Sequence, residues 1–412
     1  MNFGTDGIRG RFGSAELSVG VARQLGAALF ARLGPVRLGV VRDTRQSGPA
    51  LIEGLREGFG GEVVDFGVQP TAALSAILRD GLADFGVAVT ASHNPWHDNG
   101  LKLLGPGGFK LTVEDEGAIA ALADSRPVEG RVRSAQFDHA AALRALLPPG
   151  RWLDAHVALD AAHGAGFEVG PRLLKDLGAR VSTLGTDPDG LNINEGVGAV
   201  HPERLAAVVL ETGADVGICL DGDADRCILV NARGEVVDGD ALLLLLAVGE
   251  GVVGTVMCNA ALGRALADRG IGFDRAGVGD RQVAARMREL GWRVGGEPSG
   301  HVLLDDGLPT GDGLLTGLRV LAGGLDLVAR LRGFRLDPQA KINLAVARKP
   351  PLASVPELVR VEQDVLRSGA ERVLLRYSGT EPKLRILVEA PDADVARSLA
   401  ERIAAVAESC LG

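Results

Sequence analysis

Three strand–helix–strand patterns recur along this chain at intervals of roughly 100 residues, and this repetition limits the folds that the chain can adopt. Each pattern starts with a continuous apolar run, passes through a helical stretch and returns to a strand before a glycine turn. The opening runs lie at 36–41, 156–160 and 252–257. Continuous apolar strands separated by helices are typical of mainly parallel sheets that helices cover on both faces. The sequence therefore predicts three related mixed α/β domains.

The pattern changes after Gly333 to strand, helix, strand, strand, helix, which predicts a smaller α+β domain at the C-terminus. Composition breaks at 147–150 (LPPG) and 249–251 (GEG) mark two further boundaries. A chain of 412 residues is expected to divide into several domains, and ligands usually bind in clefts between them. We therefore expect a central active-site cleft between four domains. Their predicted ranges are 1–149, 150–250, 251–336 and 337–412.

The overall composition excludes several classes of protein. A formal net charge of −9 disfavours a general affinity for nucleic acid or anionic membranes. The first residues lack the apolar run of a signal peptide, and no segment is long and apolar enough to cross a bilayer. The four cysteines are dispersed without zinc-ligand spacing, which favours buried, reduced thiols. These features predict a cytoplasmic protein.

The strongest local signal is the segment Asp221-Gly-Asp223-Ala-Asp225-Arg226, which directly follows the apolar run 216–220. Carboxylates this close repel one another and favour a counter-cation, and a loop beyond a strand end is where α/β sheets place their sites. A few hard oxygen ligands suit magnesium bound together with a phosphate. A solvated acidic turn is an equally good interpretation of this motif alone. An EF-hand loop fits badly because the required Gly and Glu are absent.

A second signal contains Ser92, His93 and Pro95 in the segment TASHNP, after the apolar run 85–89. The proline keeps helix from extending through this segment, so Ser92 is expected on an irregular loop, where it could serve as a nucleophile or phosphate carrier. Alone, such a segment is more often a turn. Lys102 follows closely and could donate and accept protons if its pKa is lowered, although a solvated lysine is the more frequent case.

A third signal places Glu297, Ser299 and His301 at alternate positions of a glycine-rich segment. These side chains can accept and donate hydrogen bonds to sugar hydroxyls if they project to one side of an extended loop. A Ser-His-acid hydrolase is a competing interpretation, but residues this close in sequence rarely assemble a triad. An ordinary glycine-rich turn is the other alternative.

A fourth signal is the segment RYSGTEP at 376–382, followed by Arg385. Hydroxyl residues around a glycine and flanking arginines can hold a phosphate dianion through backbone and guanidinium groups. Arg9, Arg45 and Arg281 lie in similar turn contexts, although each alone could be a surface residue. The four signals fall one to each predicted domain, and independent structural explanations for all four are improbable.

These segments resemble the α-D-phosphohexomutase superfamily, and the resemblance extends in order along essentially the whole chain. It implies a phosphoserine enzyme that uses Mg2+ and a phosphosugar substrate. The resemblance implies catalytic roles for Ser92, Lys102, Arg9 and His93, magnesium binding by Ser92, Asp221, Asp223 and Asp225, and substrate binding by Glu297, Ser299, His301, Arg281, Arg376, Ser378, Gly379, Thr380 and Arg385.

Within that superfamily, the segments at 3–10, 98–103, 190–194 and 310–313 are similar to the branch that acts on glucosamine phosphates. This implies interconversion of glucosamine 6-phosphate and glucosamine 1-phosphate through phosphoserine and glucosamine 1,6-bisphosphate, in support of UDP-N-acetylglucosamine synthesis. A kinase or a sugar bisphosphate would first phosphorylate the serine, and a homodimer is left open. The alternatives are a phosphomannomutase/phosphoglucomutase, a magnesium phosphatase and a silent sugar-phosphate-binding protein.

Overall fold

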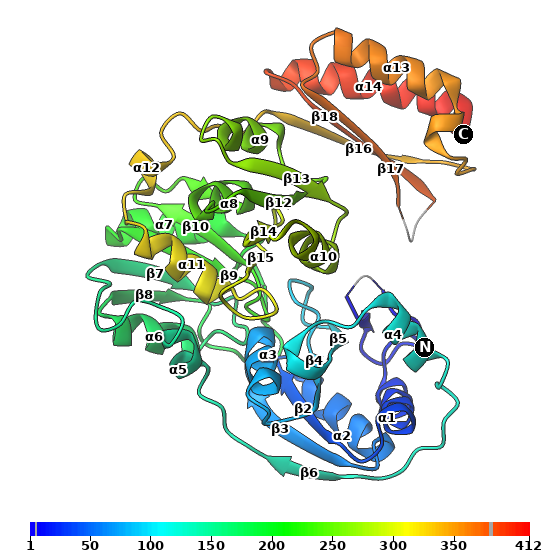
Figure 1. Ribbon diagram of the computed structural model, residues 1–412, viewed down its shortest axis with the longest axis vertical. Coiled ribbons are helices and arrows are strands. Elements are labelled where there is room, and N and C mark those ends of the chain that lie inside the picture. The colour runs from blue at the N-terminus through cyan, green and yellow to red at the C-terminus, as the bar shows by residue number, and fades with distance from the viewer. Residues whose placement is uncertain (5, 379–381) are drawn as a thin grey trace. The chain divides into compact units, whose positions relative to one another are not determined.

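The computed structural model describes residues 1–4, 6–378 and 382–412 (Figure 1). These residues form mixed α/β structure with several sheets, which confirms the predicted fold class. They divide into two compact units. The larger unit contains residues 1–255 and 274–332, and the smaller contains 256–273 and 333–412.

The first part of the larger unit is built on a six-stranded sheet. Its elements are β1 (Ile8–Arg11), α1 (Val19–Leu33), β2 (Arg37–Arg42), α2 (Gly48–Gly58), β3 (Glu62–Val68), α3 (Thr71–Arg79), β4 (Phe85–Val89), β5 (Asp98–Leu104), a 3-10 turn at Pro106–Gly108, α4 (Val113–Ala120), β6 (Arg131–Ser134) and α5 (His139–Arg144). The strand order is β1-β5-β4-β2-β3-β6, with β5 antiparallel to both neighbours. Leu38 and Val40 pack with α1 and α2, whereas Val41 and Phe66 pack with α3. Helices therefore cover both faces of this sheet.

A five-stranded sheet follows in the same unit. Its elements are β7 (His156–Asp160), α6 (Val169–Leu177), β8 (Arg180–Leu184), α7 (Pro202–Thr212), β9 (Val216–Leu220), β10 (Cys227–Asn231) and β11 (Val236–Val237). The order is β11-β10-β9-β7-β8, in which β7 is parallel to β8 and β9. Leu205 and Val209 of α7 pack against Cys219 and Val230, so this helix covers one face. The carboxyl end of β9 is thereby fixed at the edge where the acidic segment begins.

The third sheet has the order β13-β12-β14-β15. The elements of this region are α8 (Gly239–Leu246), β12 (Gly251–Thr255), α9 (Ala260–Ala267), β13 (Gly272–Ala276), α10 (Asp280–Leu290), β14 (Val294–Gly296), β15 (Val302–Leu304), α11 (Gly313–Ala322) and α12 (Leu327–Arg330). Val283 and Met287 of α10 pack on Val253 and Leu303 of the sheet. The helix of the third predicted pattern, α9, belongs to the smaller compact unit. The four predicted domain ranges remain predictions.

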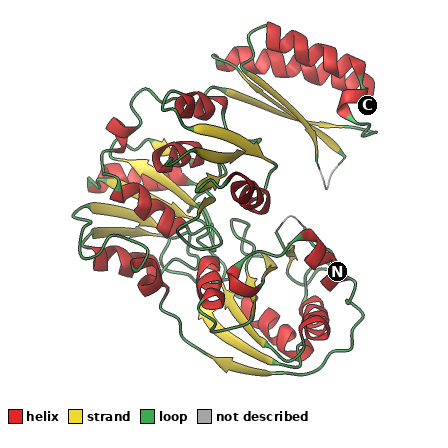
Figure 2. Cartoon of the chain, viewed as in Figure 1, coloured by secondary structure: helices red, strands yellow, loops and turns green. Residues whose placement is uncertain are grey.

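The C-terminal segment forms a three-stranded antiparallel sheet with its helices on one face (Figure 2). Its elements are β16 (Gln339–Ala345), a 3-10 turn at Leu352–Ser354, α13 (Pro356–Arg367), β17 (Arg372–Tyr377), β18 (Lys383–Glu389) and α14 (Ala393–Leu411). The strand order is β16-β18-β17. Val365 of α13 and Ile403 of α14 share one core with Ile386 of the sheet. The predicted element order of this segment is confirmed.

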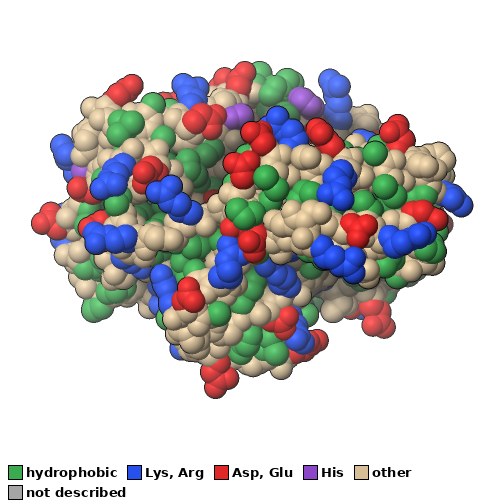
Figure 3. Space-filling model, turned by 90° about the horizontal axis from the view of Figure 1, so that it is seen from above, with side chains coloured by type: hydrophobic (Ala, Val, Ile, Leu, Met, Phe, Trp, Pro, Cys, Tyr) green, Lys and Arg blue, Asp and Glu red, His purple; other side chains and the backbone are tan. Residues whose placement is uncertain are grey.

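The distribution of surface charge and the burial of the cysteines agree with what the composition predicts. Basic and acidic side chains are interspersed over the face drawn in Figure 3. None of the described helices has the length and apolar character that crossing a membrane requires. Cys219, Cys227 and Cys258 are buried, and burial raises the pKa of the Cys219 thiol. The expectation of buried thiols is confirmed for these three residues.

Helices α1 and α2 cross at glycines. A Cβ atom on Gly58 would lie 1.9 Å from the carbonyl oxygen of Arg23, and one on Gly26 would lie 2.5 Å from that of Leu55. Such distances are far below van der Waals contact, so the two helices can pack this closely only because these positions lack side chains.

The Gly58→Ala variant should lower the free energy of unfolding by about 2–3 kcal/mol, because the methyl group forces α1 and α2 apart. Gly117 is the matched control: it lies in α4, and a Cβ atom there would meet nothing within 4 Å. Gly117→Ala should be neutral or stabilising by about 0.5–1 kcal/mol. Urea unfolding of both variants measures the difference, and equal shifts would contradict the close packing.

Candidate active site

Ser92 lies on the loop between β4 and β5 in an unusual backbone conformation. Its φ angle is 53°, in the left-handed region that residues with side chains adopt rarely. Its amide N–H donates to Thr90 Oγ1 at 2.9 Å, and the side chain is buried. Its hydroxyl donates to Asp221 Oδ2 at 2.5 Å. The structure therefore brings the predicted carrier serine to the predicted acidic loop, 129 residues away in sequence.

The acidic loop begins where β9 ends. Asp221, Asp223 and Asp225 are buried and offer carboxylate oxygens that all lie within 4.8 Å of one another. The intervening Ala224 has a φ angle of 56°, so the chain turns sharply within the loop. Burial, with Asp225 and Asp223, raises the pKa of the Asp221 carboxyl well above its ordinary value. The three carboxylates thus repel one another and favour a cation between them.

Two side chains from the first sheet's segment already bind these carboxylates. Thr71 Oγ1 donates to Asp223 Oδ2 at 2.6 Å. Lys102 Nζ donates to Asp223 Oδ2 at 2.7 Å and to Asp225 Oδ2 at 3.2 Å. The Oδ1 atom of Asp223 is buried and accepts no hydrogen bond from the described residues. A buried carboxylate oxygen without a donor is a suitable ligand for a hard divalent cation, so the acidic loop fits magnesium.

The condition under which Lys102 could donate and accept protons, a lowered pKa, is not met. Burial alone would lower that pKa, but Asp223, Asp225 and Asp6 outweigh burial and raise it well above the ordinary value. Asp6 Oδ2 lies 3.1 Å from Lys102 Nζ. The ammonium is therefore held in its charged form by the carboxylates around it.

A second buried lysine, Lys110, connects two further carboxylates. Its Nζ lies 2.7 Å from Asp6 Oδ1 and 2.6 Å from Asp280 Oδ2. Burial opposes the charge of Lys110, but Asp280 and Asp6 raise its pKa. Sequence motifs did not identify Lys110, Asp6 or Asp280 as site residues. Asp6 lies within the segment GTDGIRG and Asp280 precedes Arg281, whereas Lys110 has no motif around it.

His93 and Arg9 lie beside the serine loop. His93 Nδ1 is 3.3 Å from the Ser92 hydroxyl oxygen. Burial, with the cations Arg226 and Arg9, lowers the pKa of His93 to about 4. Arg9 forms an ion pair with Asp6. His93 is thus a neutral acceptor or donor within reach of the hydroxyl.

Glu297, Ser299 and His301 lie on the connection between β14 and β15. His301 Nδ1 is 3.5 Å from Asp225 Oδ1, and its Nε2 is 3.4 Å from Asp280 Oδ2. Burial alone would lower the pKa of His301, but these two carboxylates raise it to about 8. For Glu297, in contrast, burial raises the pKa of the carboxyl group. The predicted sugar-binding loop therefore adjoins the acidic loop through His301.

Arg281, at the start of α10, is bound to another side chain. Its Nη2 and Nη1 atoms donate to the two carboxylate oxygens of Glu116 in α4 at 2.7 and 3.1 Å. Glu116 is buried, so this bidentate pair joins α4 to α10. The predicted role of Arg281 in substrate binding remains a prediction.

The predicted phosphate loop belongs to the smaller unit. Arg376 and Arg385 are paired across β17 and β18, and burial and Arg385 lower the pKa of Arg376. Ser378 is buried, and its carbonyl oxygen accepts a hydrogen bond of 2.8 Å from Lys349 Nζ. Two adjacent guanidinium groups favour an anion between them. The predicted contacts at 379 and 380, Gly379 and Thr380, lie outside the described residues.

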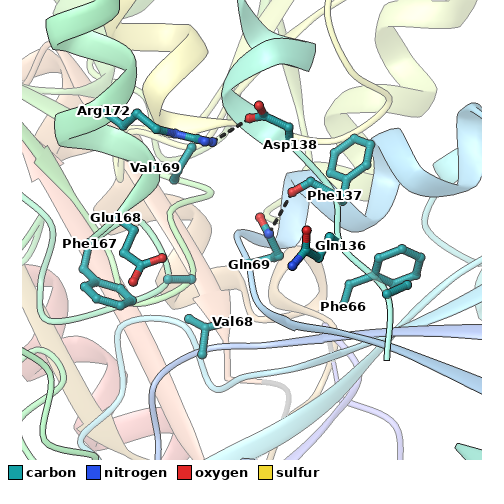
Figure 4. Close-up of a pocket in the computed structure, with 12 residues that line it drawn as sticks. Phe66, Val68, Gln69, Gln136, Phe137, Asp138, Phe167, Glu168, Val169 and Arg172 are labelled. Atoms are coloured by element: carbon teal, nitrogen blue, oxygen red, sulfur yellow. Dashed lines mark hydrogen bonds and ion pairs between the residues drawn. The ribbon is translucent and has the colours of Figure 1, made fainter. Parts of the chain in front are cut away.

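A cavity of ≈ 630 Å³ is also present in the larger unit (Figure 4). Phe66, Phe137 and Phe167 line it, and Arg172 Nη2 donates to Asp138 Oδ1 at 2.5 Å on its border. None of the predicted site residues lines this cavity. The candidate active site is therefore defined by the converging loops of the larger unit and not by this cavity.

Models of one protein family match four successive segments of the chain. They are described as phosphoglucomutase/phosphomannomutase alpha/beta/alpha domains I, II and III, at residues 1–127, 139–234 and 238–324, and its C-terminal domain, at 342–406. The chain belongs to the phosphoglucomutase/phosphomannomutase family, which confirms the predicted superfamily.

Curated relatives of this chain have a more specific name than the family. The phosphoglucosamine mutase of Methylococcus capsulatus is 42% identical over 434 residues, covering 98% of this chain and 97% of the relative. That of Cereibacter sphaeroides is 40% identical over 436 residues, covering 98% of each. Among solved structures, a phosphoglucomutase/phosphomannomutase family protein from Burkholderia thailandensis has a TM-score of 0.80 at 26% identity, covering 98% of this chain and 97% of that one. The fold is also that of an Aspergillus fumigatus N-acetylphosphoglucosamine mutase solved with GlcNAc-6P and magnesium, at a TM-score of 0.71 and 18% identity, covering 100% of this chain and 96% of that one.

Thr71 provides a test of the acidic loop as a metal site. The Thr71→Val variant should weaken magnesium binding about tenfold, because the lost hydroxyl no longer orients the Asp223 carboxylate. Thr71→Ser keeps the donor and should bind within about twofold of the parent. Isothermal titration with Mg2+ measures both affinities. Equal affinity in the parent and in Thr71→Val would show that the hydroxyl does not orient a metal ligand.

Proposed function

We propose that this protein is a mutase that interconverts glucosamine 6-phosphate and glucosamine 1-phosphate through a phosphorylated Ser92. The observation that carries this proposal is the 2.5 Å hydrogen bond from the Ser92 hydroxyl to Asp221, inside a buried cluster of three carboxylates. The shared name of the curated relatives, at 40–42% identity over nearly the whole chain, supports the amino sugar as substrate.

The reaction has two phosphoryl transfers. Phosphorylated Ser92 gives its phosphoryl group to O1 of glucosamine 6-phosphate: the bond from phosphorus to Oγ breaks, the bond from phosphorus to O1 forms, and a proton moves in net from O1 to Oγ. The resulting glucosamine 1,6-bisphosphate then reorients within the site. Its 6-phosphoryl group then passes to Ser92: the bond from phosphorus to O6 breaks, the bond from phosphorus to Oγ forms, and a proton moves in net from Oγ to O6, which leaves glucosamine 1-phosphate and restores the phosphoenzyme.

The residues around Ser92 have distinct roles in this scheme. Asp221 Oδ2 and His93 Nδ1, at 2.5 and 3.3 Å, are acceptors within reach of the serine hydroxyl proton. The ammonium of Lys102 offsets negative charge at Asp223 and Asp225 when a phosphate approaches. Magnesium bound by Asp221, Asp223 and Asp225 would offset charge on the transferring oxygens.

Substrate binding is assigned to two further loops. Glu297, Ser299 and His301 are proposed to bind the sugar hydroxyls, and the buried position of His301 beside Asp225 supports this. The paired Arg376 and Arg385 are proposed to bind the phosphate. The first phosphorylation of the serine requires a kinase or a sugar bisphosphate, and the homodimer and the cytoplasmic location remain predictions.

A phosphomannomutase/phosphoglucomutase with the same mechanism is the second candidate. The names of the matching family models and of the structural relative at 26% identity favour it. It shares the phosphoserine chemistry and differs only in the sugar.

Ser92→Ala should abolish steady mutase turnover while leaving the fold intact, because the acceptor oxygen for the phosphoryl group is gone. The parent should gain one phosphate on Ser92 by intact-mass analysis, and the variant should gain none. Ser354→Ala is the control, since this exposed serine bonds only to the carbonyl of Pro351 among the described contacts. Turnover by Ser92→Ala equal to that of the parent would refute the carrier role.

A substrate panel decides among the sugars. With Mg2+ and a catalytic amount of sugar bisphosphate, kcat/KM for glucosamine phosphates should exceed that for glucose and mannose phosphates by about tenfold or more, as expected when a site's polar groups match a substrate's. Coupled assays for each isomer and for inorganic phosphate are the measurements. Preference for glucose or mannose phosphates would favour the second candidate, and release of phosphate without isomer would indicate a phosphatase.

A further inference from the structure

Two side chains bind the backbone of the serine loop from opposite parts of the sequence. Arg45 Nη2 donates to the carbonyl oxygens of Ser92 at 3.2 Å and of Asn94 at 2.5 Å. Asn194 Nδ2 donates to the same two oxygens at 2.9 Å each. Four hydrogen bonds thus converge on two carbonyl groups, one of which belongs to the proposed carrier residue. None of the chemistry described above uses Arg45 or Asn194.

Arg45 and Asn194 are both buried, and each directs N–H groups at the two carbonyl oxygens. Arg45 is fully buried and forms an ion pair with Asp43, whose Oδ1 also accepts the Arg45 amide N–H at 3.0 Å. Burying such a charge is costly unless it is paired and hydrogen-bonded. Asn194 must direct its NH2 group at the two carbonyls, because its amide oxygen would repel them. Each side chain is therefore a donor in a site that requires donors.

The carbonyl group held in this way belongs to a residue in a rarely populated conformation. The left-handed φ of Ser92 persists only if the surroundings over-determine it. The backbone of the acidic loop packs against the same group: a Cβ atom on Gly222 would lie 2.5 Å from the Ser92 carbonyl oxygen and 3.0 Å from Asn194 Nδ2. The hydrogen bonds therefore fix the serine peptide relative to the acidic loop.

We propose that Arg45 and Asn194 are positioning residues for phosphoryl transfer: their hydrogen bonds to the Ser92 and Asn94 carbonyls hold the serine hydroxyl toward Asp221. The inference rests on the proposed function, in which Ser92 is the carrier. Arg45 lies in the segment that matches family domain I and Asn194 in the segment that matches domain II. The orientation of the carrier thus depends on both segments.

The test replaces the donating amide of Asn194 with a carboxylate of nearly the same shape. In Asn194→Asp a carboxylate oxygen faces the two carbonyls, so kcat should fall about 10- to 100-fold while KM stays within about threefold, as expected for a misplaced reacting group. Magnesium affinity should stay within about twofold in Asn194→Ala, which adds no charge beside the acidic loop, since the described contacts include none between Asn194 and the three aspartates. The control is Asn192→Asp on the same loop, because Asn192 Nδ2 donates to the Asp187 carbonyl oxygen at 2.9 Å, so that this variant loses an amide donor to a carbonyl group that is not part of the serine loop.

Single-turnover experiments separate positioning from loss of structure. In the phosphorylated Asn194→Asp enzyme, transfer to the sugar should slow more than loss of phosphate to water, whereas mere unfolding would reduce the active fraction and leave the ratio unchanged. If Asn194→Asp does not fold, Asn194→Ala and Arg45→Lys, which each remove donors without reversing polarity, should show the same change of ratio. Parental transfer rates in the folded variants would overturn the inference. A parent without turnover would overturn the proposed function, and this inference with it.

Discussion

A closed ring of alternating charges holds the loops of the larger unit together. Its members, each in contact with the next and the last with the first, are Asp6, Lys102, Asp225, His301, Asp280 and Lys110. The pKa of His301, raised to about 8, makes the imidazole largely cationic near neutral pH. Removal of one member of a buried charge pair leaves the other uncompensated, which is strongly destabilising. The relative positions of the loops that carry these six residues therefore depend on this ring.

Much of the site could be predicted because its residues follow strand ends. Ser92 follows β4 and Asp221 follows β9, and such ends are where α/β sheets place polar loops. The protonation of Lys102 could not be predicted in this way. Its pKa depends on carboxylates that are distant in sequence, including Asp6 and Asp223, and only the folded chain shows that they outweigh burial.

Other contacts carry no local signal. Thr71 begins an ordinary helix after a proline, and Lys110 is a single lysine in a glycine-rich turn, so nothing in either segment indicates a site. The helix α9 had the expected pattern, yet it belongs to the smaller compact unit. Sequence periodicity identifies elements, but which unit an element joins depends on the long-range packing of its apolar face.

The hydrogen bonds from Arg45 and Asn194 to the Ser92 carbonyl also limit which segments of the chain can move relative to one another. Because Asn194 lies 102 residues beyond Ser92 and its two hydrogen bonds are 2.9 Å long, a relative rotation that displaced the two segments by even an ångström would break both bonds. These hydrogen bonds therefore hold the segment that carries Ser92 and the segment that carries Asn194 in a fixed relative position. In the proposed reaction, the sugar is therefore expected to enter and leave, and the bisphosphate to reorient, without relative motion of these two segments.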